Sequence, residues 1–275
     1  MRFTKMQGIG NDYIYVNCFE EQVENPSALA VRLSDRHFGI GGDGVILIKP
    51  SDRADAEMDL YNADGSRAKM CGNGIRCVGK YVYDRGIARK EVLKIDTQSG
   101  IKTLYLEVKD DAVQNVRVDM GEPVLEPAKI PTTLPDAKGQ TLSVLDRQFT
   151  GTCVSMGNPH FVVFVDEVSS FPLETYGPLL ETHPAFPERA NIEFVRVCGK
   201  DEVEMRVWER GSGETWACGT GACAVAVACI LNGHTGRRVL VHLRGGDLQI
   251  FWNELTNKVE MTGPAEFVFD GEVKI

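Results

Sequence analysis

The chain has 275 residues, of which 43% are hydrophobic and 25% charged, and its formal net charge is -9 at pH 7. This length is enough for two domains of typical size, each with its own core. The negative charge argues against a nucleic-acid partner, which requires clustered Lys and Arg. It allows a small anionic substrate, which one Arg or a helix N-terminus can hold.

No apolar run is long enough to span a bilayer, and the N-terminus leads into no signal-peptide core, so we expect a cytoplasmic protein without a membrane partner. The chain has eight cysteines. Without a secretion signal we expect reduced thiols, and without a C-x-x-C pair or a Cys/His cluster we expect no metal site. Most of the cysteines are expected to be small buried hydrophobes, among them Cys77, Cys223 and Cys229.

Local patterns predict alternating strands and helices along the chain. The predicted strands are 14–16, 45–48, 104–106, 116–118, 161–165, 203–208 and 248–252. The predicted helices are 28–37, 173–181 and two that begin at a C-G-x-G motif and end at Gly86 and at Gly233. The last of these is apolar on all faces over 222–230, so it must be buried, wrapped by a curved sheet.

A repeat becomes visible at a constant offset of 147 residues. The matching positions are Gly10-Asn11 with Gly157-Asn158, Val45 with Ile192, Tyr61-Asn62 with Trp208-Glu209, Cys71-Gly72-Asn73-Gly74 with Cys218-Gly219-Thr220-Gly221, and Gly86 with Gly233. A weaker match at a shorter offset pairs 118–123 with 259–264. Agreement at one register over so long a stretch indicates two homologous domains.

We therefore expect an α+β fold of two pseudo-symmetric domains. Each would be a curved, mostly antiparallel, barrel-like sheet around a central buried helix, with the active site in the cleft between the domains. A Pro-rich stretch, 122–136, joins them. The expected domains are residues 1–119 plus 265–275, carrying Cys71, and residues 120–264, carrying Cys218. The closing segment, 266–275, has no place in the second repeat and is expected to complete the first sheet.

The C-G-x-G motifs stand where a helix begins, and this placement suits acid–base chemistry. Unpaired N–H groups and the positive end of the helix dipole favour an anion there, which predicts a lowered thiol pKa for Cys71 and Cys218. The glycines let a substrate carboxylate approach the backbone. One C-G-x-G alone is more often a turn than a site, but two at equivalent places predict a pair of thiols that invert a carbon centre without a cofactor.

At these residues the sequence resembles the diaminopimelate epimerase family over essentially its whole length. The segments that carry the resemblance are M-Q-G-I-G-N-D (6–12), N-A-D-G-S (62–66), M-C-G-N-G-I-R-C (70–77), S-M-G-N-P-H (155–160), P-E-R-A-N-I (187–192), E-R-G-S-G-E-T-W-A-C-G-T-G (209–221) and 261–264.

The resemblance implies interconversion of LL- and meso-2,6-diaminopimelate toward lysine and peptidoglycan, with no cofactor and in a homodimer. It implies Cys71 and Cys218 as the acid/base pair, and His160 and Glu209 beside them as groups that tune their protonation. It also implies substrate binding by Asn11, Asn62, Gly72, Asn73, Asn158, Asn191, Glu209, Arg210, Gly219 and Thr220. Arg210 is suited to the distal carboxylate because Arg can grip a carboxylate with two hydrogen bonds.

The chain departs from the family pattern at two places. Some members have Gln at the position of Gly44, and some have a Tyr that supports dimerisation at the position of Phe269. Three other interpretations stay open: a proline or hydroxyproline racemase of the same fold, a thiol-redox protein, and an amino-acid-binding protein. A racemase would leave Arg210 and the asparagines without a distal head to bind.

Overall fold

The computed structural model describes residues 1–274, which form two compact units. The first unit comprises Met1–Asp119 and the chain from Thr262 on, and the second is Met120–Met261. The sequence-based domain boundary at 264/265 therefore needs a small correction, since residues 262–264 belong to the first unit. No helix within residues 1–274 is both long enough and apolar enough to cross a membrane.

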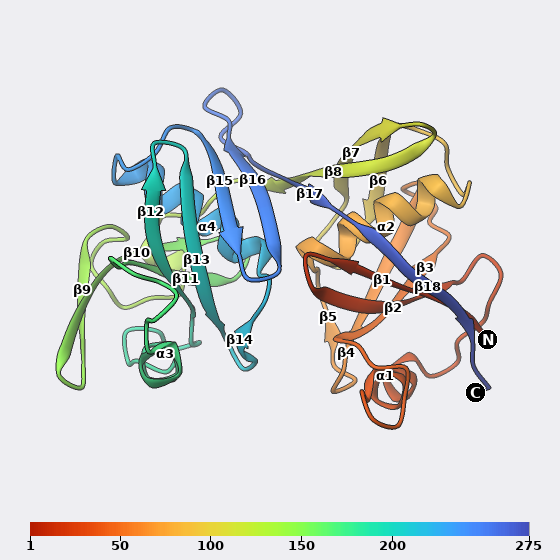
Figure 1. Cartoon of the computed structure of the whole chain (residues 1–275), viewed down its shortest axis with the longest axis horizontal. Coiled ribbons are helices and arrows are strands. Elements are labelled where there is room, and N and C mark those ends of the chain that lie inside the picture. The colour runs from red at the N-terminus through yellow and green to blue at the C-terminus, as the bar shows by residue number, and fades with distance from the viewer. Residues whose placement is uncertain (275) are drawn as a thin grey trace. The chain divides into compact units, whose positions relative to one another are not determined.

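The first unit alternates strands with two helices. Its elements are β1 (Arg2–Gly8), β2 (Asn11–Asn17), α1 (Pro26–Ser34), β3 (Gly44–Lys49), β4 (Ala56–Asn62), β5 (Arg67–Ala68), α2 (Gly72–Asp84), β6 (Val92–Asp96), β7 (Lys102–Lys109), β8 (Ala112–Gly121) and β18 (Glu266–Glu272). β8 ends just past the first boundary. The closing strand, β18, lies antiparallel beside β1 (Figure 1), which confirms that the end of the chain completes the first sheet; Ile275 lies outside the described residues.

The second unit repeats the element order of the first from β10 on, after a short 3-10 helix and the additional strand β9. Its elements are η1 (Pro127–Lys129), β9 (Gln140–Val144), β10 (Arg147–Ser155), β11 (Pro159–Phe164), α3 (Leu173–Glu181), β12 (Asn191–Gly199), β13 (Glu202–Glu209), β14 (Gly213–Thr215), α4 (Gly219–Leu231), β15 (Arg238–Leu243), β16 (Gly246–Trp252) and β17 (Val259–Pro264), which crosses the second boundary.

Strand pairing repeats between the units at the offset read from the sequence. β2 and β3 pair in parallel with Ile14 opposite Val45, and β11 and β12 pair in parallel with Phe161 opposite Ile192. The antiparallel neighbours follow, with β3 against β4 in one unit and β12 against β13 in the other. Parallel strands need a crossover between them, and α1 and α3 supply it in the two units. The predicted pair of homologous, mostly antiparallel sheet domains is confirmed.

The helices that follow the C-G-x-G motifs are the most buried of their units. α4 is buried along almost its whole length, as its uniformly apolar sequence predicts, and it contacts β10, β11 and β16. α2 contacts β1, β2 and β7 and exposes only its polar side. A buried helix fixes its first turn firmly against the sheet, and each catalytic candidate thiol lies at such a first turn.

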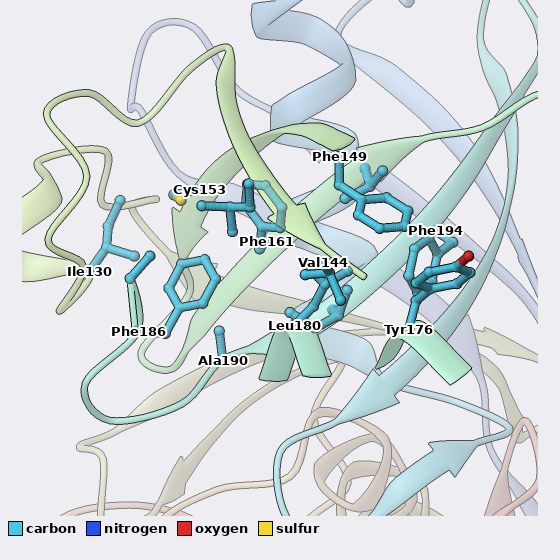
Figure 2. Packing of buried hydrophobic residues seen from close by; sticks show 14 of the residues in the cluster. Ile130, Val144, Phe149, Cys153, Phe161, Tyr176, Leu180, Phe186, Ala190 and Phe194 are labelled. Atoms are coloured by element: carbon cyan, nitrogen blue, oxygen red, sulfur yellow. The ribbon is translucent and has the colours of Figure 1, made fainter. Parts of the chain in front are cut away.

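The second unit has a further apolar cluster on the side of α3. Phe149, Tyr176 and Phe194 lie close together there, and Phe161 packs on Phe186 (Figure 2). The ring centroids of Phe149 and Tyr176 are 5.0 Å apart in an edge-to-face arrangement, a favourable geometry for aromatic pairs. This packing holds α3 against the strands whose ends carry the candidate site.

One predicted helix has different bounds. The sequence predicted 28–37, whereas α1 runs from Pro26 to Ser34. Asn25 caps it and Pro26 occupies its first turn, where a missing N–H costs nothing. Its end is set by Asp35, whose carboxylate accepts hydrogen bonds from the N–H groups of His37 and Phe38 and turns the chain away.

Candidate active site

Cys71 caps α2 in the first unit. Its backbone is extended, and its Sγ accepts a hydrogen bond from Gly74 N at 3.3 Å, so the sulfur occupies the place that a Ser or Asp oxygen takes in ordinary helix caps. A side chain at Gly74 would meet Ile46 Cδ1 at 2.7 Å, so Ile46 would have to shift to admit any residue larger than glycine in this first turn. The predicted position of a thiol at a helix start is confirmed here.

Asn11 and Tyr13 lie beside the Cys71 thiol. Asn11 Oδ1 lies 3.3 Å from Sγ, and the Asn11 amide is held from its other end by Asp43 Oδ2 at 2.6 Å. Asp43 is itself paired with Arg36. Tyr13 is buried against the same thiol, and burial, with the Cys71 charge second, raises the pKa of its phenol well above the ordinary value. Tyr13 therefore stays a neutral hydroxyl.

The other candidates of the first unit have structural contacts. Asn73 Oδ1 accepts a hydrogen bond from the buried Arg76 at 2.9 Å, so its side chain points into the unit. Asn62 ends β4, and its Nδ2 donates to Ser66 Oγ at 3.0 Å in the N-A-D-G-S turn. Gly72 is the first residue of α2 and lies between Cys71 and Asn73.

Cys218 caps α4 in the second unit in the same way. Its Sγ accepts from Gly221 N at 3.4 Å and lies 3.6 Å from Thr220 Oγ1. A side chain at Gly221 would lie 3.1 Å from the sulfur and 2.8 Å from Glu193 Oε1. Gly219 opens the helix. Both motifs thus form a helix cap with a sulfur acceptor, at equivalent positions of the repeat.

A buried histidine–carboxylate pair lies beside Cys218. His160 and Glu193 are both 0% exposed, and His160 Nδ1 lies 2.6 Å from Glu193 Oε1. The other ring nitrogen, Nε2, lies 3.1 Å from Asn158 Oδ1. The parallel pairing of β11 and β12 brings these residues together, since both strands begin at this edge of the sheet.

A second carboxylate, that of Glu209, approaches the same thiol. Glu209 ends β13, accepts a hydrogen bond from Thr215 Oγ1 and interacts with Cys218. Burial raises the pKa of its carboxyl, and the neighbouring Glu193 adds to the effect.

The predicted lowering of the Cys218 thiol pKa is wrong. Burial raises this pKa well above its ordinary value, and the carboxylates of Glu209 and Glu193 raise it further. The hydrogen bonds from Thr220 and Gly221 act in the opposite direction but do not outweigh them. The helix start does favour the anion, yet removal from water and two like charges cost more. Cys218 rests as a thiol that holds its proton.

Two substrate-binding candidates are linked by a hydrogen bond at the start of β12. Asn191 is buried, donates to Pro159 O at 2.8 Å and accepts from the backbone N of Arg210 at 3.0 Å. It therefore fixes the loop that carries Arg210. The Arg210 guanidinium is exposed, and its Nη1 donates to Glu188 O at 3.0 Å.

The two departures noted in the sequence have different surroundings. A side chain at Gly44 would meet Tyr61 O at 2.2 Å and Tyr13 at 3.0 Å, so this backbone has no room for the Gln that some family members carry. Phe269 lies on β18, is 47% exposed and packs edge-to-face on Phe3 with the ring centroids 5.8 Å apart.

The sequence interpretation missed Tyr13 and Glu193. The 147-residue offset carries a signal for both, because it pairs Tyr13 with His160 and Ile46 with Glu193. A glutamate in the apolar run N-I-E-F-V is a second signal, since a charged residue in a strand buried on both faces is unusual. Each unit thus offers a helix-capping thiol, backbone N–H groups that can bind a carboxylate, and polar groups that adjust the protonation of the thiol.

Comparison with known proteins gives a consistent result. The family model for diaminopimelate epimerase matches residues 3–126 and 152–268. Diaminopimelate epimerase of Acetivibrio thermocellus is 58% identical over 277 residues, covering 100% of this chain and 99% of that protein. The protein of the same name from Agathobacter rectalis is 56% identical over 284 residues, covering 100% of both.

Solved structures share the fold at low sequence identity. A hydroxyproline epimerase from Agrobacterium vitis matches with a TM-score of 0.73 and 15% identity, covering 99% of this chain and 90% of that one. A Bacillus anthracis phenazine biosynthesis protein matches with a TM-score of 0.73 and 16% identity, covering 100% of this chain and 99% of that one. At these identities the likeness shows the fold alone.

Proposed function

The chain belongs to the diaminopimelate epimerase family and is an isomerase, and on this premise we propose that it interconverts LL- and meso-2,6-diaminopimelate by a two-thiol mechanism without a cofactor, on the route to lysine and peptidoglycan. The observation that carries the mechanism is the matched pair of helix caps. Cys71 Sγ and Cys218 Sγ each accept a hydrogen bond from the backbone N–H three residues on, at positions related by the repeat.

In the proposed reaction the two thiols act on opposite faces of one α-carbon. One group, as thiolate, takes the α-proton, and the other, as thiol, gives its proton to the opposite face. One C–H bond breaks and another forms, and at the end the two sulfur atoms have exchanged protonation states. The reverse reaction uses the same groups with their roles exchanged, so no oxidant or cofactor is required.

The difficult step is removal of a weakly acidic α-proton, because negative charge develops on the substrate carboxylate. Backbone N–H groups in the first turns of α2 and α4, starting at Gly72-Asn73 and Gly219-Thr220, are suited to stabilise that charge. The amides of Asn11, beside the Cys71 thiol, and of Asn158, beside the His160 imidazole, would hold the α-ammonium and carboxylate, since an amide both donates and accepts.

The distal amino-acid head separates this function from that of a racemase acting on proline. We assign its carboxylate to Arg210, with Asn62, Asn191 and Glu209 on the loops and strand ends around the head. Substituting Arg210→Gln should raise the KM for diaminopimelate by about 10- to 100-fold with a smaller change in kcat, because a charge-assisted contact to the non-reacting end is lost. A KM within twofold of the wild-type value would remove Arg210 from this role.

One experiment tests the function as a whole. The protein is incubated with LL-diaminopimelate in deuterated water under reducing conditions, and the isomer ratio and α-deuterium content are followed together. Wild type should form the meso isomer with solvent label, whereas Cys71→Ala and Cys218→Ala should each lose epimerisation by about 10²- to 10⁴-fold. Full turnover by either variant would end the two-thiol mechanism, and turnover of proline instead would support the racemase alternative.

The homodimer remains a prediction from the resemblance, and the cytoplasmic location remains a prediction from the sequence pattern. Sedimentation of the purified chain at micromolar concentration should give twice the chain mass of 30.3 kDa. A monomer at all concentrations would remove the homodimer from the proposal and leave the chemistry as it stands.

A further inference from the structure

The buried carboxylate of Glu193 has no counterpart in the first unit. At the matching position β3 carries Ile46, whose Cδ1 lies under Gly74 in the way that Glu193 Oε1 lies under Gly221. The fold therefore accepts an aliphatic side chain beneath the first turn of the helix. A carboxylate that is 0% exposed is costly to bury, so its presence in the second unit calls for a chemical reason.

The contacts of Glu193 point toward the site. One oxygen, Oε1, accepts from His160 Nδ1 at 2.6 Å, and the other, Oε2, is buried without a hydrogen-bond partner among residues 1–274. A Cβ atom placed on Gly221 would lie 2.8 Å from Glu193 Oε1 and 3.1 Å from Cys218 Sγ. The carboxylate and the thiol therefore both lie beside the Gly221 backbone.

We propose that Glu193 is a positioning residue for the side chains around Cys218, which we call the Cys218 half-site. Glu193 holds the His160 proton on Nδ1 and keeps the Cys218 proton on sulfur. This inference rests on the proposed function. With one proton fixed on Nδ1, His160 Nε2 is the nitrogen left to exchange a proton. Asn158 Oδ1 lies 3.1 Å from Nε2 and, being an acceptor, takes a hydrogen bond from it when Nε2 is also protonated. Glu193 touches neither substrate nor reacting carbon and acts through these two groups.

The titratable groups around Glu193 come from three elements. They are His160 on β11, Cys218 at the start of α4, and Glu209 at the end of β13. The carboxylates of Glu193 and Glu209 both disfavour a thiolate at Cys218, which agrees with the direction of its pKa. Removing the Glu193 charge should therefore make the thiolate easier to form.

The first test needs no variant. With ¹⁵N-labelled histidine, the ring nitrogen shifts of His160 in the wild-type chain should show Nδ1 protonated from pH 6 to pH 9. An unprotonated Nδ1 anywhere in this range would overturn the proposal. Glu193→Ile, which installs the residue of the first unit, should abolish the preference for Nδ1 if the variant folds.

The second test compares the pH dependence of alkylation at the two thiols. Iodoacetamide is added to the full chain, and the peptides that contain Cys71 and Cys218 are quantified separately by mass spectrometry. In Glu193→Gln the midpoint for Cys218 should fall by about one to two pH units, while that for Cys71 should not move. An unchanged or raised Cys218 midpoint in a folded variant would contradict the proposal.

Glu204→Gln is the matched control. Glu204 lies on β13, the strand paired with β12. Its carboxylate forms an ion pair with Arg196, with Oε2 2.7 Å from Arg196 Nη2. The substitution Glu204→Gln removes one negative charge from the same sheet, and it should leave the alkylation midpoints of Cys71 and Cys218 unchanged. A shift as large as that of Glu193→Gln would show that any loss of charge suffices, which the proposal does not allow.

Kinetics provide the third readout. In Glu193→Gln, kcat should fall by about tenfold with KM nearly constant, and the basic limb of the kcat/KM profile should move to lower pH in both reaction directions. Glu193→Asp, which keeps the charge, should restore the limb. The nitrogen shifts and alkylation need no substrate, so failure of wild type to invert diaminopimelate would refute the proposed function while leaving these two tests decisive.

Discussion

The helix-capping thiol of the first unit has Tyr13 and Ile46 beside it, whereas that of the second has His160 and Glu193 at the matching positions. The backbone of the two first turns is the same, and so is the hydrogen bond from the helix to each sulfur. Their electrostatic surroundings differ: neutral amide and phenol groups adjoin one thiol, and carboxylates and an imidazole adjoin the other.

This difference shows that the repeat gives both thiols the same backbone geometry. The residues that differ at matching positions give them different acid–base properties. Both directions of an epimerisation need one thiolate and one thiol at the same moment. Two identical thiols would bind the single proton equally well. Surroundings of unequal charge make the proton bind preferentially to one of the two sulfur atoms. Burial and two carboxylates hold a proton on Cys218, so we expect the Cys71 half-site to supply the first base.

Among the substitutions that compare the surroundings of the two thiols, the largest effect is expected from removing the imidazole. His160→Gln should lower kcat/KM by about 10²-fold, because it removes the ionisable partner of Glu193 and of the Cys218 half-site. Tyr13→Phe, at the matching position, should cost tenfold or less, since the phenol stays neutral throughout. Steady-state kinetics of both variants, with thermal melts to confirm folding, make the comparison; equal losses would mean that the half-sites are chemically alike.

A smaller effect is expected from alanine at the paired glycines. Both Gly74→Ala and Gly221→Ala overpack a first turn and should destabilise their unit by about 1–3 kcal/mol. The new methyl meets the flexible end of Ile46 in the first unit, whereas in the second it meets the Glu193 carboxylate and the Cys218 sulfur. Activity per folded molecule should therefore fall further in Gly221→Ala. The reverse order would show that Glu193 does not need its place beside the thiol.

The smallest effect concerns stability and pH. Burial raises the pKa of the Glu209 carboxyl, so the folded state prefers the protonated form and loses stability as pH rises through that pKa. Glu209→Gln removes this cost, and its melting temperature relative to wild type should increase by roughly 2 °C from pH 5 to pH 8. Scanning calorimetry of both proteins at the two pH values measures this difference in melting temperature. If the difference is smaller at pH 8 than at pH 5, the pKa of Glu209 is not raised in the folded state.

Sequence alone predicted what is local or repeated. The offset of 147 residues predicted two equivalent units, and the structure shows the same strand register in both, although which strands pair was not predicted. The glycine pattern predicted the two helix starts, since a side chain at a helix N-cap accepts a hydrogen bond from an N–H group of the first turn. The end of α1 was missed because Asp35 can cap its own turn, a competing local hydrogen bond that hydrophobic spacing does not report.

The protonation of Cys218 could not be predicted in the same way. The helix start argues for an anion, but the charges that decide the matter come from Glu193 and Glu209, on strands that precede the helix in sequence and meet it only in the folded unit. Their effect depends on burial, which the sequence pattern indicates for a strand as a whole and not for one carboxylate.

The most direct test of the paired thiols is hydrogen exchange without inversion. In deuterated water, Cys71→Ala and Cys218→Ala should each wash deuterium into the α-position of one diaminopimelate isomer and not the other, because each retains a base on one face only. The isomer labelled by one variant should be the isomer spared by the other. Labelling of both isomers by a single variant would contradict the account, since one thiol cannot reach both faces of the carbon.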